Sequence, residues 1–380
     1  MLVAMATVVW SPIVPAEEWF IAPRASVSLE HNDNIRLVTQ NQEVVTGIVL
    51  DAGVDLSNES ETTKITLTPS VQLKRYQADS DLDSNIALLE GGIKHSMERA
   101  ALGLTADIRR DTTLVSELED SGNLLTTTDR NYYSLNPSAA YQLSERSTVT
   151  ASAGFSRTDY DQGSRTDLVD YRSDTLSASY SYRLTEVDDL SVTAYRQDYQ
   201  ATSIDSEATT TGLQLGLSRR FSEFVTGRAM LGTHTTDYKF LVLGVFPFES
   251  SQSGTIGELG ITAKLELTEL EAALSQKVVP SAIGDVQEQT ALRVTASRRL
   301  TEKLKGSVGA TLLKNDAFEQ STSDRDYRDL NASLSYQWLP EWWLTGSYNY
   351  RWQKYASQND DADSNVLRMG VEYRGLKQGQ

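Results

Sequence analysis

The chain has 380 residues, a formal charge of -17 and no cysteine. Such an acidic balance argues against nucleic acid as a partner, and the missing cysteines fit a compartment in which thiols would be oxidised. Mean hydropathy is -0.38, and no central segment approaches the run of about 20 apolar residues that a membrane-spanning helix needs.

The first segment differs from the rest of the chain. Residues 1–16, MLVAMATVVWSPIVPA, are apolar and end in Val14-Pro15-Ala16, a small-residue cleavage pattern. We therefore predict a secretory signal peptide over 1–16 and a mature chain, 17–380, that forms one domain. The basic start of such a signal is missing, so we expect the true start to lie some residues upstream. A buried first strand or helix is the alternative.

From there on, side chains alternate between apolar and polar with a period of two. Leu213, Leu215 and Leu217, for example, share one face of a predicted strand, opposite small polar residues. Helical spacing is nowhere sustained. The pattern predicts eighteen strands, with sixteen as the alternative because the first two alternate least clearly. The predicted strands are 26–36, 44–57, 62–77, 84–97, 99–113, 129–143, 146–160, 169–184, 188–200, 207–221, 224–239, 253–267, 269–282, 287–300, 303–315, 325–338, 341–356 and 364–376.

A short motif recurs between these strands at intervals of roughly forty residues. It consists of a bulky apolar residue, then Ser, Thr or Pro, then Glu. The copies are YQLSE (141–145), YRLTE (182–186), RRFSE (219–223), LELTE (265–269), RRLTE (298–302) and QWLPE (337–341). We interpret each copy as a tight turn in which the Ser or Thr hydroxyl bonds turn backbone and the Glu lies in water; in the last copy Pro340 presets φ instead. The other strand ends are joined by longer acidic loops.

Short turns at one end, long loops at the other and alternating strands predict an all-β fold, a closed antiparallel transmembrane β-barrel. Aromatic residues near strand ends, such as Tyr141, Tyr182, Trp338 and Trp342, fit an interfacial girdle, to which Tyr132, Tyr133, Tyr160, Trp343 and Tyr350 are also assigned. A soluble β-solenoid or a pair of sandwiches is the alternative, but both would need bulkier apolar faces. An even strand number places both termini on the turn side, the periplasm of a Gram-negative cell. The final stretch from Arg368 to Gly375 is similar to the signal read by the outer-membrane assembly machinery.

The alternation also sorts the charges. Basic residues outnumber acidic ones on the polar face, which predicts a basic lumen that favours anions, although the same residues could pair with acidic loops folded inward. The residues that we expect to line an anion path are Arg109, Arg228, Lys264, Arg293, Lys305, Arg351 and Arg368.

Candidate chemistry is sparse. His234 and Asp237 lie on opposite faces of one predicted strand, so they cannot act together without a bulge, and we predict no enzyme. Residues 361–365, DADSN, with Glu372 mimic a calcium loop, but Val366 replaces the Gly and the stretch alternates as a strand. We expect no resident metal or cofactor.

The turns with L-[ST]-E, the stretch YSYRLTE and the early SLEHNDNIRL (28–37) resemble β-barrel porins encoded beside exopolysaccharide synthesis and export genes. This resemblance implies a channel for a secreted, anionic polysaccharide, acting with a periplasmic polysaccharide-export protein. The alternatives are a general anion-preferring diffusion porin and a structural or adhesive barrel with acidic loops. In each case the expected surroundings are outer-membrane lipid and lipopolysaccharide.

Overall fold

A computed structural model describes residues 19–77, 80–119, 122, 127–161, 168–242, 246–318, 324–358, 360–375 and 378–379. The predicted signal peptide lies outside these residues. Within them no helix has the length and apolar character needed to cross a membrane. The strands are β1 (Trp19–Asn32), β2 (Val45–Glu59), β3 (Thr63–Tyr76), β4 (Ser84–Ser96), β5 (Ala100–Thr112), β6 (Asp129–Ser144), β7 (Ser147–Tyr160), β8 (Tyr171–Arg183), β9 (Asp188–Ala201), β10 (Ser206–Arg220), β11 (Val225–Val242), β12 (Phe246–Lys264), β13 (Thr268–Pro280), β14 (Val286–Arg299), β15 (Leu304–Ala317), β16 (Arg325–Leu339), β17 (Trp342–Tyr355), β18 (Ala362–Arg374) and β19 (Gln378–Gly379).

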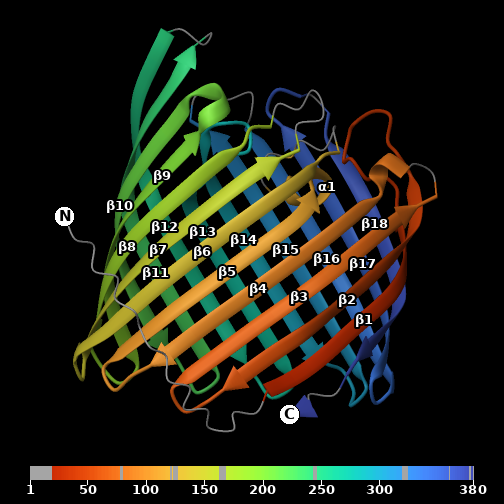
Figure 1. Cartoon of the computed structure of the whole chain (residues 1–380), viewed down its shortest axis with the longest axis horizontal. Helices are drawn as coiled ribbons and strands as arrows, with labels where there is room; N and C mark the ends of the chain where they lie inside the picture. Colours follow the sequence, from red (N-terminus) through yellow and green to blue (C-terminus); the bar gives the residue numbers. More distant parts are fainter. Residues whose placement is uncertain are drawn as a thin grey trace, which may run out of the picture.

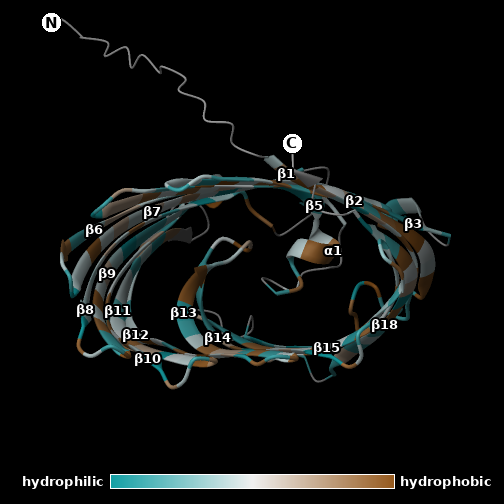
Figure 2. Ribbon diagram, turned by 90° about the horizontal axis from the view of Figure 1, so that it is seen from below, coloured by the Kyte–Doolittle hydropathy of each residue, from teal (hydrophilic) through white to brown (hydrophobic). Residues whose placement is uncertain are grey.

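These strands form one closed sheet. Each strand from β1 to β18 pairs antiparallel with its neighbours in sequence, and β1 pairs with β18, from Arg24 opposite Arg374 to Asn32 opposite Val366. The strands are tilted (Figure 1) and enclose an elongated lumen (Figure 2). The two-residue β19 adds to the first residues of β1. The predicted closed antiparallel barrel of eighteen strands is therefore confirmed.

The predicted alternation separates the two faces of the wall. On β10, Leu213, Leu215 and Leu217 point outward with 53%, 63% and 43% of their surface exposed. Gln214 lies between the first two leucines, Ser218 follows the third, and both have the opposite, inward parity. An apolar outer face around a polar interior is the arrangement of a transmembrane barrel, because lipid solvates the leucines and water the lumen.

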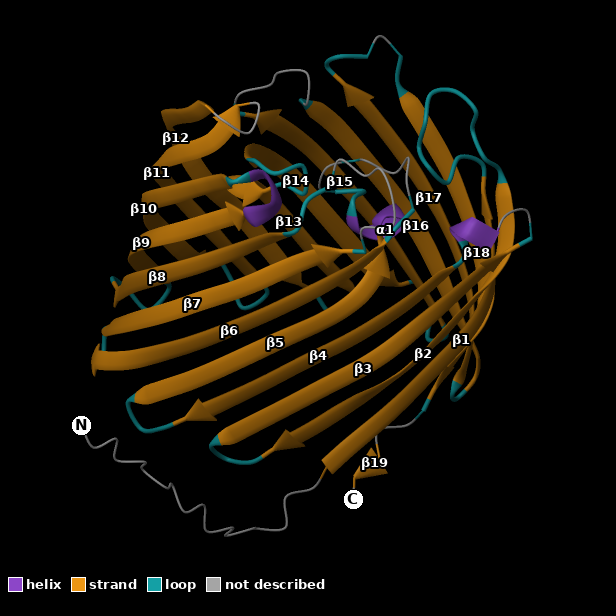
Figure 3. Cartoon of the chain, turned by 45° about the horizontal axis from the view of Figure 1, so that its top comes forward, coloured by secondary structure: helices purple, strands orange, loops and turns teal. Residues whose placement is uncertain are grey.

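In most copies of the repeated motif the Ser or Thr holds the turn, as predicted. The copy at 265–269 differs, because its Thr268 is already the first residue of β13. Thr185 Oγ1 accepts hydrogen bonds from the backbone N–H of Val187 (3.2 Å) and Asp188 (3.0 Å). Ser222 and Thr301 accept hydrogen bonds from backbone N–H groups of their own turns in the same way. Because the hydroxyl replaces a strand partner, each hairpin reverses within a few residues, and all these turns lie at one end of the barrel (Figure 3).

The first predicted strand, 26–36, was placed wrongly. The observed strand starts at Trp19 and ends at Asn32. The Asn34 side chain bonds both the N–H (3.1 Å) and the C=O (2.8 Å) of Val38, which folds residues 33–38 into a loop. At the other end, Pro23 lies beside the last residue of β18, so its missing N–H costs the ladder at most a terminal bond.

The pair β11–β12 is longer than predicted. Its ladder continues to Val242 opposite Phe246 and projects beyond the other strands (Figure 1). The residues 249–253, ESSQS, carry no apolar alternation, so the pattern could not show this extension. At the turn end, 265–267 belong to the turn and not to the strand.

The aromatic girdle needs a similar correction. Tyr141, Tyr182, Trp338 and Trp342 are exposed on the outer surface near the turns. Three other predicted members, Tyr132, Tyr160 and Trp343, have inward parity in the ladder. Their side chains therefore belong to the lumen side of the wall. A position near a strand end does not decide whether a side chain points outward or inward.

Candidate channel lumen

Two segments enter the lumen from the loop end (Figure 2). The first is the upper part of the β13–β14 hairpin. β12 pairs with β13 only from Gly257 to Lys264, and above this point β13 leaves the wall. The hairpin then packs on β9 and β10 through an apolar cluster of Tyr199, Ala201, Ala208, Val278 and Val286.

Hydrogen bonds fix the tip of this hairpin. The Tyr199 hydroxyl donates to the carbonyl of Ser281 (3.1 Å), and the N–H of Val169 donates to the carbonyl of Ala282 (2.8 Å). Gly284, with φ +94°, lies against Ile204 where a Cβ would not fit. These contacts give the upper part of the β13–β14 hairpin a fixed position inside the barrel.

The second segment follows β5 and contains the short helix α1 (Thr113–Ser116). Leu114 and Leu118 join an apolar cluster with residues of the far wall, among them Leu313 and Tyr327. The Arg325 guanidinium donates to the carbonyl of Leu118 (2.6 Å), and Arg293 forms an ion pair with Glu119 (2.8 Å). The α1 segment therefore crosses the lumen from β5 to β14–β16.

Glu117 anchors this segment on the near side. Its side chain is fully buried and accepts a hydrogen bond from the Tyr160 hydroxyl (2.7 Å). The neighbouring Arg130 binds both oxygens of Asp111 at 2.9 Å. Such bidentate, charge-assisted bonds fix geometry strongly, so the base of the α1 segment is rigid.

A charged network lies where the barrel closes. Glu30 on β1 and Arg368 on β18 stand directly opposite each other, with Arg368 Nε 3.1 Å from the carboxylate. Lys74 on β3 reaches the same carboxylate at 3.7 Å. Beside it, Arg351 lies 3.5 Å from Asp329. Glu30 keeps 3% of its surface exposed, so its charge depends on these cations.

The structure pairs most of the predicted basic residues with carboxylates. The pairs of Arg293, Arg351 and Arg368 are described above. In addition, Arg109 lies 3.6 Å from Asp107, and Lys264 lies 3.7 Å from Glu269. Arg228 forms an ion pair with Glu258. In the described part of the chain, Lys305 has no carboxylate within 4.0 Å. All seven have inward parity, but the pairs reduce the excess of positive charge that the alternation predicted.

Sequence reasoning did not assign four of the six acidic partners, Glu30, Glu119, Glu269 and Asp329, to the lumen. It also missed Asp51, which is hydrogen-bonded there but is not one of these partners. Glu30, Asp51 and Asp329 face the lumen, where Asp51 accepts a hydrogen bond from Ser26 (2.9 Å). Asp329 follows the parity of its own predicted strand, so the alternation would have shown it. For Glu30 and Asp51 the signal was weak, because the first two strands alternate least clearly.

The wall formed by β6–β9 contrasts with this network. Between charged residues at its two ends, such as Arg130 and Arg183, its inward side chains are mainly hydroxyl, amide and tyrosine groups, for example Ser138, Ser177 and Gln197. We call this surface the hydroxyl wall. A cavity of about 950 Å³ lies along it, with Pro280 of the inward hairpin opposite. Among the residues that the structure describes, Lys94 is the one charged residue lining this cavity. An uncharged polar surface of this kind holds water without attracting either sign of ion.

His234 and Asp237 lie on opposite faces of β11, as predicted, with His234 buried and Asp237 exposed. The calcium-like stretch lies mostly in β18 and begins no helix. The described residues contain no group of three or more His, Cys, Asp or Glu placed to hold a metal ion.

No protein-family model and no curated protein matches this sequence. Solved structures match its shape weakly. A BenF-like porin from Pseudomonas fluorescens Pf-5 is 11% identical, with 96% of this chain and 99% of that chain covered and a TM-score of 0.49. OccAB4 of Acinetobacter baumannii is 12% identical (97% and 100% covered, TM-score 0.48), and OpdL of Pseudomonas aeruginosa is 13% identical (95% and 99% covered, TM-score 0.46). At these values the likeness carries no argument about function, which rests on the barrel itself.

Proposed function

We propose that this protein is an outer-membrane channel through which small hydrophilic solutes diffuse. The observation that carries the proposal is a closed barrel with an apolar outer face and a polar lumen that holds a cavity of about 950 Å³. Each strand from β1 to β18 pairs with both of its neighbours, so the ring has no open edge strand, as a lipid environment requires. The general diffusion porin is therefore our preferred function.

The passage follows the hydroxyl wall. The α1 segment and the charged network fill the side of the lumen near β1, β3 and β16–β18, where a cavity of about 280 Å³ remains between Glu30, Leu118 and Arg351. The cavity along β5–β9 is larger and its lining is nearly free of charge. Hydroxyl and amide groups there exchange hydrogen bonds with passing polar solutes, and no fixed charge holds a solute in place.

Anion preference remains part of this proposal, since the lumen keeps basic residues such as Lys305 and Lys94. Most of the others have a carboxylate partner, so we expect the preference to be modest. Purified protein in planar bilayers tests the function directly. A stable conductance, together with swelling of liposomes in small sugars, supports a diffusion channel. A barrel that conducts nothing in either assay would instead favour the structural or adhesive alternative.

Polysaccharide export is the second candidate. Hydroxyl groups and the tyrosines Tyr132 and Tyr171 along the cavity suit the hydroxyls and ring faces of sugars. An acidic polymer would meet the inward hairpin and the α1 segment, so export would require both to move, with the periplasmic export protein as the natural trigger. Efflux of a labelled acidic oligosaccharide from proteoliposomes would favour this function over simple diffusion.

The orientation proposed here places the turns and both chain ends in the periplasm. A tag inserted at Asp361 should then react on intact cells, and one at Glu302 should react only after the outer membrane is permeabilised. Both positions are exposed in short connections, so insertion is expected to be tolerated. The opposite labelling pattern would reverse the orientation without affecting the fold.

A further inference from the structure

Basic and acidic residues two positions apart occur at the loop end of several strands, on the outer surface. Along the outward face of these strands, the apolar residues give way to a charged pair near the loop end. On β7, for example, the outward residue Phe155 is followed by Arg157 and Asp159. The pairs are Arg157–Asp159, Arg172–Asp174, Arg196–Asp198 and Lys314–Asp316, on β7, β8, β9 and β15. We call the first three, which lie on adjacent strands, the outer charged belt.

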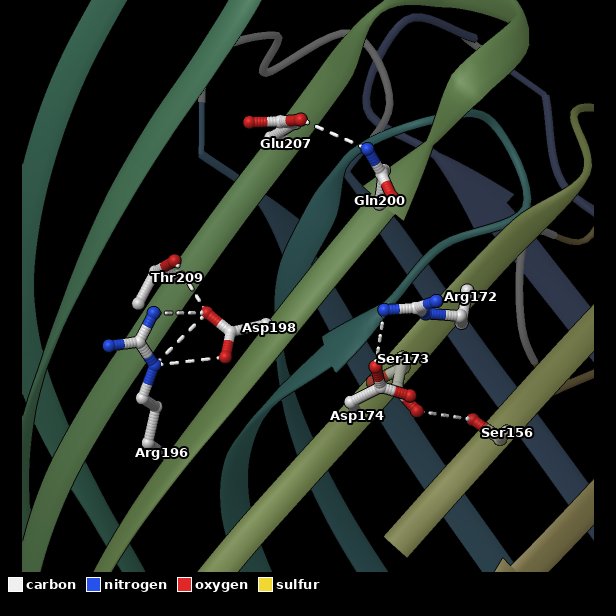
Figure 4. A network of polar contacts seen from close by, with 9 residues as sticks. All are labelled: Ser156, Arg172, Ser173, Asp174, Arg196, Asp198, Gln200, Glu207 and Thr209. Atoms are coloured by element: carbon white, nitrogen blue, oxygen red, sulfur yellow. Dashed lines mark hydrogen bonds and ion pairs between the residues drawn. The ribbon is translucent and has the colours of Figure 1, made fainter. Parts of the chain in front are cut away.

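The contacts in this belt hold the cationic groups in place. Arg196 and Asp198 bond at 2.8 Å, and Thr209 on β10 donates to the same carboxylate at 2.8 Å (Figure 4). Arg172 lies 2.7 Å from Asp174, and Arg157 Nε lies 2.8 Å from Asp159. The three arginine side chains nevertheless stay 60–67% exposed. Each guanidinium has five N–H donors, so donors remain for a second partner.

The register then brings like charges together. Arg157 stands directly opposite Arg172, and Asp174 stands directly opposite Asp198. Like charges in such positions destabilise a sheet, because their side chains are only about 5 Å apart. If the charged pair on β7 stood two residues earlier along its strand, an acidic residue would face Arg172 and this repulsion would be absent. The arrangement is therefore suited to an anionic ligand above the two arginines.

The turn end of the same surface is built differently. Leu184, Phe221, Phe224, Trp338 and Trp342 are exposed there. Arg219 and Arg298 also have outward parity, but Arg219 lies over the Phe221 ring and 3.6 Å from Asp188. These arginines stand on separate strands of the barrel, β10 and β14, without a second arginine opposite. Paired guanidinium groups thus distinguish the belt from the turn end.

We propose that the outer charged belt binds the phosphate groups of lipopolysaccharide in the outer leaflet. Arg157 and Arg172 together grip one phosphate, since guanidinium groups bind phosphate oxygens in bidentate fashion. Asp174 and Asp198 face the divalent cations that accompany such a headgroup layer. A headgroup with several phosphates and bound cations fits this alternation of sign better than a phospholipid with a single phosphate. The proposal rests on the proposed outer-membrane placement and orientation, but not on channel activity.

The test compares two double variants of the full barrel in detergent. Binding of purified lipopolysaccharide is measured for the parent, for Arg157→Gln with Arg172→Gln, and for Arg219→Gln with Arg298→Gln. We expect the belt variant to lose affinity by at least about tenfold, because it loses charge-assisted bonds to phosphate. The turn-end variant, which removes the same number of outward arginines, should bind like the parent.

Heat-modifiable migration on a gel confirms that each variant is folded, and the conservative variant Arg157→Lys with Arg172→Lys should keep part of the binding. Equal losses in both double variants, or none in the belt variant, would overturn the proposal. The proposal would also be overturned if the parent bound dephosphorylated lipopolysaccharide as tightly as intact lipopolysaccharide. If vesicles of phosphatidylglycerol compete as well as lipopolysaccharide does, the belt recognises anionic lipid in general and the assignment to lipopolysaccharide is wrong.

Discussion

The hydroxyl wall of β6–β9 and the charged network of β1, β3 and β16–β18 lie in the same lumen, yet their side chains have different roles. In the network Glu30 joins the first and last strands through Arg368, so its charges help to close the sheet. In the hydroxyl wall, neutral groups such as Ser152 and Ser177 bond each other across strands at 2.6 Å. The comparison separates residues that hold the barrel shut from residues that a solute meets.

The largest effect is expected from breaking the closing network. Glu30→Gln leaves Lys74 and Arg368 side by side without their carboxylate, and this should lower the free energy of unfolding by about 3 kcal/mol. Urea unfolding in lipid vesicles measures it. Glu59→Gln is the matched control, because Glu59 and Lys64 are exposed and 3.3 Å apart, so its cost should stay below about 1 kcal/mol. Similar losses for both would show that closure does not depend on the network.

Releasing the α1 segment should widen the passage. Leu118→Ser with Glu119→Gln removes the apolar contact with the far wall and the ion pair with Arg293. Because conductance follows the open cross-section, we expect it to rise by a factor of about two in planar bilayers. Val115→Ser, on the exposed side of the same helix, should leave it unchanged. If the double variant conducts like the parent, current already bypasses the segment along the hydroxyl wall.

Removing basic residues tests how far the pairs cancel their charge. Replacing Arg109, Arg228, Arg293 and Arg351 by Gln leaves Asp107, Glu258, Glu119 and Asp329 without their partners. The reversal potential in a salt gradient should therefore shift towards cation preference, while the fold is kept, since lumen substitutions mainly tune selectivity. Unchanged selectivity would mean that these arginines do not contribute to the potential in the passage.

The smallest effect is expected from adding a single carboxylate to either side of the lumen, the hydroxyl wall or the charged network. Ser177→Asp adds an unpaired charge to the hydroxyl wall and should weaken anion permeation measurably. Ser347→Asp adds the same charge opposite Arg368, where a cation neutralises it, and should change selectivity less. Reversal potentials of the two variants in the same salt gradient decide this point. A larger shift for Ser347→Asp would place the passage on the charged side.

The sequence by itself determined the barrel, its strand number and the two faces, because a period of two assigns every side chain to lipid or lumen. It also predicted the turns, since the hydroxyl of residues such as Thr185 acts on backbone a few residues away. Parity further placed all seven basic residues inward. It could not show that six of them meet carboxylates, because parity gives the face and not the partner.

Only the tertiary structure decided those partners and the shape of the lumen. Glu30 meets Arg368 because closure of the ring sets the register of β1 against β18, and no local pattern encodes a contact over that separation. The α1 segment and the β13–β14 hairpin turn inward because apolar side chains such as Leu118 and Val278 find buried positions on distant strands. Their local sequence is compatible with exposed loops. The free energy that directs them inward comes from surface that exists only after the barrel has closed.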